Sequence, residues 1–478
     1  MRKRTLLLAA TLTTGLLTAL PAATASAAPS GLSGDFNGDG YRDVAISAST
    51  ATVGSVRYAG AVVVLYGSSS GVSAARKTVI TQNSTGVPGT AEEGDNFGGS
   101  LAAGDLDGDG YSDLVVGAPS ESIGDRDSVG AATVLWGSKS GLSGGSSLPS
   151  PSGLTEWGGY SSGIATGDFN GDGKTDVTVT GQTKTGLYRG PFARTGKPAG
   201  LTDVYEVGTT YEVIAGDLDG DGAAERVYPY TVSGDHGGVI EYLSYDPEGY
   251  DSHPESDYVG TELTAADGHQ GVIGDINGDG YGDLVLGDHE DPRSDKTTGH
   301  KGGQISVWYG GPNGPDPAQA PTVINQDTAG VPGAGETDDR FGFSLAVGDI
   351  NGDKYADVAV GAFDEDNGSA KDSGSVTVLF GSATGLTGSG AKSYTQNTTG
   401  VPGSSETNDE FGMSVRLVDL DKNGKADLVV GSGYENNYGA VTVLRGTASG
   451  LTTTGAKSFT ARDVSLKGDA SFGWVIAQ

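Results

Sequence analysis

The chain has 478 residues, of which 83 are glycine, and a formal net charge of −32 at pH 7. This charge has the wrong sign for binding a phosphate backbone or an anionic membrane surface, so it argues against nucleic acid as a partner. Cysteine is absent, which excludes disulfide scaffolds, cysteine-ligated metals and thiol catalysis.

The N-terminal residues 1–27 have the pattern of a secretory signal peptide. A basic segment at 2–4 precedes an apolar run at 6–20, and small residues at 25–27 form a cleavage site. No later segment approaches the ~20 apolar residues of a membrane span. We therefore expect residues 28–478 to be a secreted, extracellular chain without a membrane span.

A nine-residue acidic pattern, Asp-apolar-(Asp/Asn)-Gly-Asp-Gly-x-x-Asp, then recurs seven times. Side-chain oxygens at positions 1, 3, 5 and 9, with a backbone carbonyl at position 7, suit the oxygen-rich coordination of Ca²⁺ better than the tight octahedron of Mg²⁺. Glycines at positions 4 and 6 allow positive φ as the loop curls around the ion. The candidate ligands are Asp35, Asn37, Asp39, Tyr41 and Asp43; Asp105, Asp107, Asp109, Tyr111 and Asp113; Asp168, Asn170, Asp172, Lys174 and Asp176; Asp217, Asp219, Asp221, Ala223 and Glu225; Asp275, Asn277, Asp279, Tyr281 and Asp283; Asp349, Asn351, Asp353, Tyr355 and Asp357; and Asp419, Asp421, Asn423, Lys425 and Asp427. The pattern predicts up to seven Ca²⁺ sites.

An EF-hand is the alternative interpretation of these loops. It requires a bidentate Glu at position 12 and flanking helices. Position 12 is instead occupied by Ile46, Val116, Val179, Tyr228, Leu286, Val360 and Val430. A β-rich alternation begins directly after position 9 and indicates a strand, so we predict strand–loop–strand sites. The apolar residues at position 2 are expected to anchor each loop to the core.

A larger unit of four short strands surrounds each acidic loop. Phe97, Phe341 and Phe411 each begin a Phe-Gly strand eight residues before the first Asp of a loop. Seven units of ~50–70 residues predict an all-β, seven-bladed propeller. The chain ends in another Phe-Gly strand at 472–478, which lacks a loop of its own. We expect it to complete the first blade and so close the ring.

The Phe-Gly and Gly-Ala-Pro elements around these loops resemble the FG-GAP repeat of the integrin α-chain N-terminal propeller. The resemblance spans essentially all of 28–478 and is most specific at the second, sixth and seventh loops. It implies a seven-bladed propeller with calcium between the first two strands of a blade, often serving adhesion or ligand binding. Integrin α chains carry metal in only some blades and continue into stalk and membrane segments, which we do not expect in this chain, so we expect a free secreted propeller rather than a heterodimeric adhesion receptor.

The function predicted from these features is that of a calcium-binding extracellular binding or adhesion module. We expect a monomer that binds an extracellular protein or carbohydrate ligand, and we identify no catalytic constellation. The alternatives are an extracellular lyase or hydrolase acting on polysaccharide, and a lectin. The five histidines are expected to be solvated in loops, and the Tyr-rich stretch 188–258 is the region expected to have specialised if any has.

Other recurring or aromatic residues are given structural interpretations. Trp136, Trp308 and Trp474 lie in strand patterns and are expected to pack in the core, whereas Trp157 is ambiguous. A Gly-Val-Pro-Gly segment followed by an acidic run precedes three of the Phe-Gly strands. The acidic runs are 92–95, 336–339 and 406–409. Their repetition in three blades favours structural or surface loops over a single active site.

Overall fold

The computed structural model describes residues 30–205, 212–230, 239–246, 257–292 and 299–477. The predicted signal peptide therefore lies outside the described residues. Helix is almost absent from the described part, where the single helical element is the 3₁₀ turn η1 (Glu435–Asn437). Nothing in those ranges forms a helix of the length and apolarity that a membrane crossing needs.

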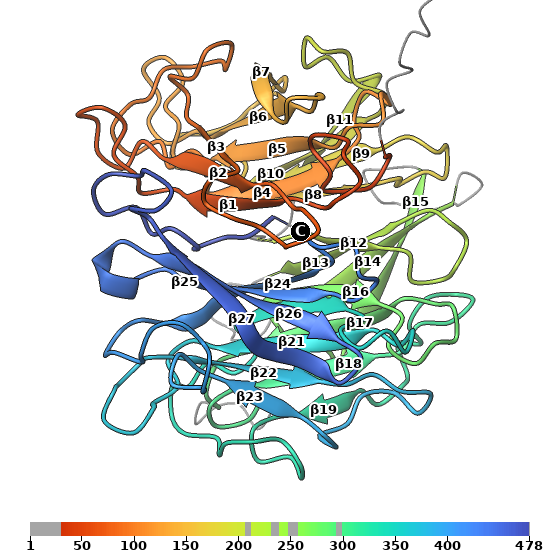
Figure 1. The fold of residues 1–478 in the computed structure, drawn as a ribbon. Coiled ribbons are helices and arrows are strands. Elements are labelled where there is room, and N and C mark those ends of the chain that lie inside the picture. Colours follow the sequence, from red (N-terminus) through yellow and green to blue (C-terminus); the bar gives the residue numbers. More distant parts are fainter. Residues whose placement is uncertain (1–29, 206–211, 231–238, 247–256, 293–298, 478) are drawn as a thin grey trace, which may run out of the picture.

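The described chain is all-β and consists of seven antiparallel sheets arranged around a centre, which confirms the seven-bladed propeller (Figure 1). The first three sheets contain β1 (Val44–Ala48), β2 (Ala61–Leu65) and β3 (Lys77–Ile80); β4 (Ser100–Gly104), β5 (Asp113–Ala118), β6 (Ala131–Trp136) and β7 (Ser143–Ser147); and β8 (Gly163–Gly167), β9 (Asp176–Thr180), β10 (Lys184–Arg189) and β11 (Gly200–Tyr205). The next two contain β12 (Ile214–Gly216), β13 (Glu225–Tyr230), β14 (Val239–Tyr245) and β15 (Tyr258–Leu263); and β16 (Gln270–Gly274), β17 (Asp283–Asp288), β18 (Gln304–Trp308) and β19 (Thr322–Ile324). The last two contain β20 (Ser344–Gly348), β21 (Asp357–Ala362), β22 (Ser375–Leu379) and β23 (Lys392–Tyr394); and β24 (Phe411–Val418), β25 (Asp427–Ser432), β26 (Ala440–Thr447) and β27 (Gly450–Thr460).

The middle strands of the blades are apolar on both faces because each sheet packs between two neighbours. Every residue of β2, β5 and β21 is buried, for example. Burial on both faces explains why these strands read as continuous Val, Leu and Ala runs rather than as a strict polar–apolar alternation. The outermost strands are more exposed, as in β7, where no residue is fully buried.

The C-terminal segment supplies the fourth strand of the first blade, as predicted. Ile476 pairs with Ile46 of β1 in an antiparallel bridge. The Ser47 N–H donates to the Val475 carbonyl at 2.8 Å, and the Ala477 N–H donates to the Ala45 carbonyl at 2.9 Å. The ring is therefore closed by hydrogen bonds between the two ends of the described chain.

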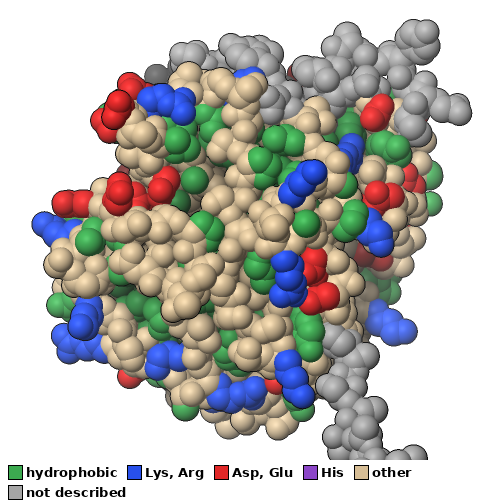
Figure 2. Space-filling view, turned by 90° about the horizontal axis from the view of Figure 1, so that it is seen from above, with side chains coloured by type: hydrophobic (Ala, Val, Ile, Leu, Met, Phe, Trp, Pro, Cys, Tyr) green, Lys and Arg blue, Asp and Glu red, His purple; other side chains and the backbone are tan. Residues whose placement is uncertain are grey.

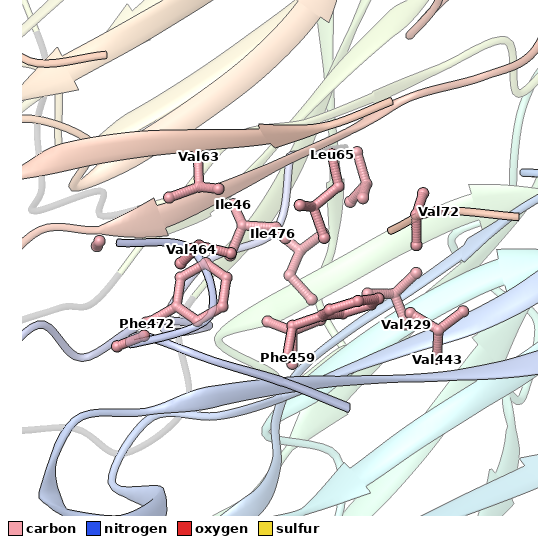
Figure 3. Packing of buried hydrophobic residues seen from close by; sticks show 14 of the residues in the cluster. Ile46, Val63, Leu65, Val72, Val429, Val443, Phe459, Val464, Phe472 and Ile476 are labelled. Atoms are coloured by element: carbon pink, nitrogen blue, oxygen red, sulfur yellow. The ribbon is translucent and has the colours of Figure 1, made fainter. Parts of the chain in front are cut away.

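A hydrophobic cluster fills the junction at which the ring closes. Ile46 and Leu65 of the first blade meet Val429 and Phe459 of the last blade, and the C-terminal Phe472 lies among them (Figure 3). Phe472 is fully buried. The first and last blades are thus held together by apolar burial as well as by the strand pairing.

Strand direction divides the molecule into two faces. Six of the acidic loops join the first strand of a blade to its second, and the first loop leads directly into β1, which pairs with the C-terminal segment. All seven loops therefore lie at one end of the blades, here called the metal-loop face. The other end of the blades is called the opposite face. It contains the segments that join the second strand of a blade to the third, and the segments that lead into the first strand of the next blade. Acidic and basic side chains are interspersed on the side shown in Figure 2, where the described residues form no continuous basic patch.

Candidate metal centres

Each acidic loop is wound around the carboxylate of its first residue. In the first loop, the Asp35 carboxylate accepts the backbone N–H of Asp39 at 3.2 Å and that of Gly40 at 2.7 Å. The N–H at position 6 makes the same bond to the first Asp in all seven loops, over 2.6–3.1 Å. These bonds hold the side chains of positions 1, 3 and 5 on one side of a tight turn.

The carboxylate at position 9 ties the loop to the sheet. One oxygen of Asp43 accepts the N–H of Phe36 at 3.0 Å, and the other accepts the N–H of Gly67 at 2.9 Å. Equivalent pairs of bonds are made by Asp113, Asp283, Asp357 and Asp427. The position-2 side chains are buried as predicted, namely Phe36, Leu106, Phe169, Leu218, Ile276, Ile350 and Leu420. The loop is therefore rigid on its core side, and its remaining oxygens are directed outward.

Burial leaves the position-9 carboxyls with strongly perturbed protonation. Burial raises the pKa of Asp43 to about 8 and that of Glu225 to about 8, and nearby loop carboxylates add to both shifts. Burial likewise raises the pKa of Asp113, Asp357 and Asp427 to about 7. These carboxylates are therefore costly to keep ionised without a nearby positive charge.

Three of the loops bring three carboxylates close enough together to bind one cation. In each, an oxygen from positions 1, 3 and 9 lies within 4.8 Å of the other two: Asp105, Asp107 and Asp113; Asp217, Asp219 and Glu225; Asp419, Asp421 and Asp427. These are the three loops with Asp at position 3. The other four have an Asn there, Asn37, Asn170, Asn277 and Asn351, whose amide oxygen carries no charge. The position-5 carboxylates lie outside these three clusters.

Two oxygen atoms in these loops are buried acceptors without a donor. They are Oε1 of Glu225 in the fourth loop and Oδ1 of Asn423 in the seventh. A buried acceptor that receives no hydrogen bond is unfavourable by about 1–3 kcal/mol. A hard divalent cation would satisfy both atoms, so the residues present fit a calcium ion.

Arginine side chains already pair with some of these acids, which the sequence analysis did not predict. Arg194 reaches from the third blade to Asp107 at 2.6 Å and to Asp109 at 2.5 Å. Arg76 pairs with Asp39 at 3.1 Å, and Arg445 pairs with Asp421. The described acids of the fourth, fifth and sixth loops have no such ion pair. No sequence signal could have revealed these contacts, because the arginines come from different strands and at different spacings.

Neighbouring loops are linked directly by backbone hydrogen bonds. The carbonyl of the first Asp of one loop accepts the N–H of position 8 in the next; Ala356 donates to Asp275 at 2.9 Å and Ala426 to Asp349 at 2.7 Å. The same bond joins the first loop to the second, the third to the fourth, and the fourth to the fifth. Five of the seven junctions are thus connected, so a change in one loop reaches its neighbour.

Two lysines occupy loop positions that favour glycine, and one offers a stability test. Lys354, at position 6, has φ of 77°, in the left-handed region. A non-glycine residue in this conformation is destabilised by about 1–2 kcal/mol, because its Cβ lies too close to the following carbonyl oxygen. We expect Lys354→Gly to raise the free energy of unfolding by about 1 kcal/mol, measured by denaturant unfolding. Lys174→Gly is the control, because position 7 does not have positive φ; equal stabilisation by both variants would contradict this account.

The opposite face carries most of the exposed large hydrophobic side chains of the described residues. Trp157 is 65% exposed, Tyr434 40%, and Tyr58 and Trp474 36% each. The rings of Tyr434 and Trp474 lie 5.9 Å apart in an edge-to-face arrangement. Trp136 and Trp308 are buried as predicted, but the prediction that Trp474 packs in the core is wrong, because its ring lies at the surface end of the closing strand.

The prediction that the histidines are solvated is wrong for two of them. His269 and His289 are half-buried, their rings lie 5.0 Å apart, and His289 packs against Phe343. Burial lowers the pKa of His289 to about 3, and His269 adds to the shift. His236 and His253 lie outside the described residues. In the Tyr-rich stretch, Tyr188, Tyr228, Tyr242 and Tyr258 are buried and pack in the core. Residues 206–211, 231–238 and 247–256 of the stretch lie outside the described residues, so its specialisation for a ligand stays a prediction.

A cavity of about 570 Å³ lies between the first strands of the blades. Most of its lining is small or apolar, but Glu212, His269 and Arg416 also line it. Burial raises the pKa of Glu212 to about 8. Burial and the proximity of Arg42 lower the pKa of Arg416 to about 10. In this cavity, ionisable side chains from outside the metal loops line one shared space.

Comparison with protein families identifies the repeats. The FG-GAP repeat matches residues 27–65, 97–135, 341–379 and 411–444. The FG-GAP-like repeat matches residues 168–228. These matches fall on units recognised above by their acidic loop.

Individual relatives include integrin α chains. The chain is 31% identical to mouse integrin alpha-IIb over 241 residues, 48% of this chain and 20% of the relative. It is 28% identical to Drosophila melanogaster integrin alpha-PS2 over 290 residues, 59% of this chain and 16% of the relative. It is also 30% identical to mouse phosphatidylinositol-glycan-specific phospholipase D over 183 residues, 38% of this chain and 20% of the relative. The chain thus spans a fifth or less of each relative.

Proposed function

We propose that this chain, which contains FG-GAP repeats and is similar to integrin α chains, is a secreted, calcium-stabilised module that binds an extracellular ligand. The seven acidic loops hold up to seven Ca²⁺ ions through the residues at positions 1, 3, 5 and 9 and the carbonyl at position 7. The ions stabilise the metal-loop face, and the ligand binds elsewhere. A role in adhesion follows if the ligand is a cell-surface or matrix molecule.

The observation that carries this proposal is the distribution of exposed aromatic side chains. Four of the five exposed large hydrophobic residues in the described chain, Tyr58, Trp157, Tyr434 and Trp474, lie on the opposite face, away from the metal loops. Tyr and Trp contribute disproportionately to binding energy at interfaces. The fifth, Val323, lies on the outer strand β19.

The test is a binding screen with an aromatic-face variant. The secreted chain is applied to a glycan array and to immobilised extracellular-matrix proteins, and each hit is repeated with the double variant Trp157→Ala/Trp474→Ala. We expect affinity for the true ligand to fall roughly tenfold or more, about 1.4 kcal/mol. Val323→Ala is the control and should leave binding unchanged. Hits restricted to glycans favour the lectin alternative, and hits insensitive to the double variant contradict the proposed face.

An extracellular enzyme remains the second candidate, because of the cavity that contains Glu212, His269 and Arg416. One relative, the mouse phospholipase D named above, is an enzyme by name. An activity screen on pectins and related polysaccharides tests this candidate. Cleavage that is lost in Glu212→Gln supports it, whereas cleavage that is unaffected by that variant places any activity outside this cavity.

A further inference from the structure

Three acidic runs that the sequence analysis treated as surface loops form a second, repeated arrangement on the opposite face. The last Asp of each run belongs to a set of three residues in which a Gln is followed by the Asp 13 residues later and by a Glu 39 residues later: Gln82, Asp95 and Glu121; Gln326, Asp339 and Glu365; Gln396, Asp409 and Glu435. We call these the Gln–Asp–Glu clusters. None of the other five glutamines in the sequence is followed by acidic residues at both spacings.

The same hydrogen bonds form within each of the three clusters. The Gln82 amide Nε2 donates to a Glu121 carboxylate oxygen at 2.7 Å, and the same bond joins Gln326 to Glu365 and Gln396 to Glu435. The Asp of each cluster accepts a backbone N–H from the residue three positions before it, at 2.6–2.7 Å. The Gln follows the outer strand of one blade and the Glu follows the second strand of the next blade, so each cluster bridges two blades.

The Gln and the Asp of each cluster are buried and the Glu is half-buried, and each cluster contains an acceptor without a hydrogen-bond donor. Gln82 is 5% exposed, Gln326 3% and Gln396 5%, and the amide oxygen Oε1 of all three has no hydrogen-bond donor. This oxygen is bonded to the same carbon as Nε2, so it lies within about 5 Å of the Glu carboxylate. Recurrence of one orphan atom in three separate blades makes it a property of the motif.

Negative charge in the clusters has no basic counterpart among the described residues. Asp95 is 2% exposed, and Asp339 and Asp409 are 3% exposed, yet none of the cluster carboxylates forms an ion pair with a described Lys or Arg. Burial raises the pKa of Asp409 to about 7, and contact with Glu435 adds to the shift. Two neighbouring carboxylates without a cation are unfavourable in a buried setting.

We propose that each Gln–Asp–Glu cluster is a second type of divalent-cation site, which binds Ca²⁺ through the Gln amide oxygen and the Asp and Glu carboxylates. Amide and carboxylate oxygens are ligands that Ca²⁺ prefers. A bound ion satisfies the orphan acceptor and compensates the buried charge in one step. The three ions link blades 1 and 2, 5 and 6, and 6 and 7 on the face opposite the seven acidic loops.

The test counts bound calcium by native mass spectrometry on the full secreted chain. The triple variant Glu121→Gln/Glu365→Gln/Glu435→Gln keeps the shape of each side chain and is expected to bind three fewer Ca²⁺ than the wild type. Glu93→Gln is the matched control, since it removes the same charge from an exposed residue of the first acidic run, and its calcium count should not change. Asp107→Asn, in the second acidic loop, reports on the loop sites separately.

The outcomes separate this inference from the calcium-loop proposal. If the triple variant retains the wild-type count while Asp107→Asn loses one ion, the clusters are not cation sites and the loop sites stand. If the triple variant does not fold, Glu435→Gln alone is measured in the same way. It should lose one ion, and an unchanged count in that folded variant overturns the proposal.

Discussion

In excess chelator, the protein is expected to melt many degrees lower than in millimolar Ca²⁺, and the loss should reverse when Ca²⁺ is restored. Extracellular calcium modules bind with Kd of about 10⁻⁴–10⁻³ M. At about 1 mM Ca²⁺, each site then contributes roughly 0.4–1.4 kcal/mol by mass action. Seven loop sites together contribute roughly 3–10 kcal/mol, which is comparable with the whole stability of an ordinary domain. Differential scanning calorimetry with and without chelator measures the effect.

The effect of chelator should grow as the pH rises from about 5 to 8. Burial raises the pKa of six position-9 carboxyls to between about 6, for Asp283, and about 8, for Asp43. Without a cation, the unfolded chain loses these protons first, because its carboxyls ionise near pH 4. The stability that protonation provides is therefore lost as pH passes through the folded pKa values. Bound Ca²⁺ replaces the proton, so the calcium-loaded protein should not show this loss.

Two variants distinguish stabilisation by Ca²⁺ bound in the loops from a general effect of ions on a negatively charged protein. Asp107→Asn removes a charge from a loop whose three carboxylate oxygens converge, and it should reduce the stabilisation by Ca²⁺. Glu93→Gln removes an equal charge from an exposed position and should not. A melting curve that is identical in chelator and in Ca²⁺ contradicts the assignment of metal to the loops.

Removal of residues 472–478 is expected to abolish cooperative folding. The deletion removes two buried side chains, Phe472 and Ile476, from the cluster between the first and last blades (Figure 3). Burial losses of this kind are unfavourable by about 3–5 kcal/mol for Phe and 2–5 kcal/mol for Ile. The deletion also exposes the hydrogen-bonding edge of β1, which becomes a site for aggregation. The total approaches the stability of a typical domain.

The measurement is thermal unfolding followed by circular dichroism, together with the size distribution in solution. The control is Trp474→Ala, which alters the same segment at a side chain that is 36% exposed and should lower the melting temperature only slightly. A truncated chain that stays monomeric and melts cooperatively near the wild-type temperature would show that the ring does not depend on this closure.

Several features of the site were open to sequence reasoning, and others were not. The loop pattern predicted the buried position-2 side chains and the tight curl of the loop at its glycines, because both depend on residues within nine positions of each other. The pairing of Arg194 with Asp107 and Asp109 joins two blades and follows no fixed spacing. The contact of His269 with His289 depends on how β16 and the segment after β17 are juxtaposed. The sequence therefore led to the wrong environment for these histidines.

The Gln–Asp–Glu clusters lie between these two cases. The acidic runs that supply their Asp residues repeat in the sequence and were interpreted as structural or surface loops, whereas the Gln and the Glu of each cluster were not identified from the sequence. Only the fold shows that Gln82 and Glu121, 39 residues apart, are in contact and that Gln82 is buried.

The sequence by itself determined the number of blades, the place of the acidic loop in each and the closing role of the C-terminal strand. Those features repeat with the same local order, so the pattern of short-range turns and apolar strands defines them. Tertiary structure alone decided which charges meet across blade boundaries, which oxygens remain without a donor and which aromatic rings face solvent. These depend on the packing of one blade against the next, and contacts between residues far apart in the chain leave no periodic trace in it.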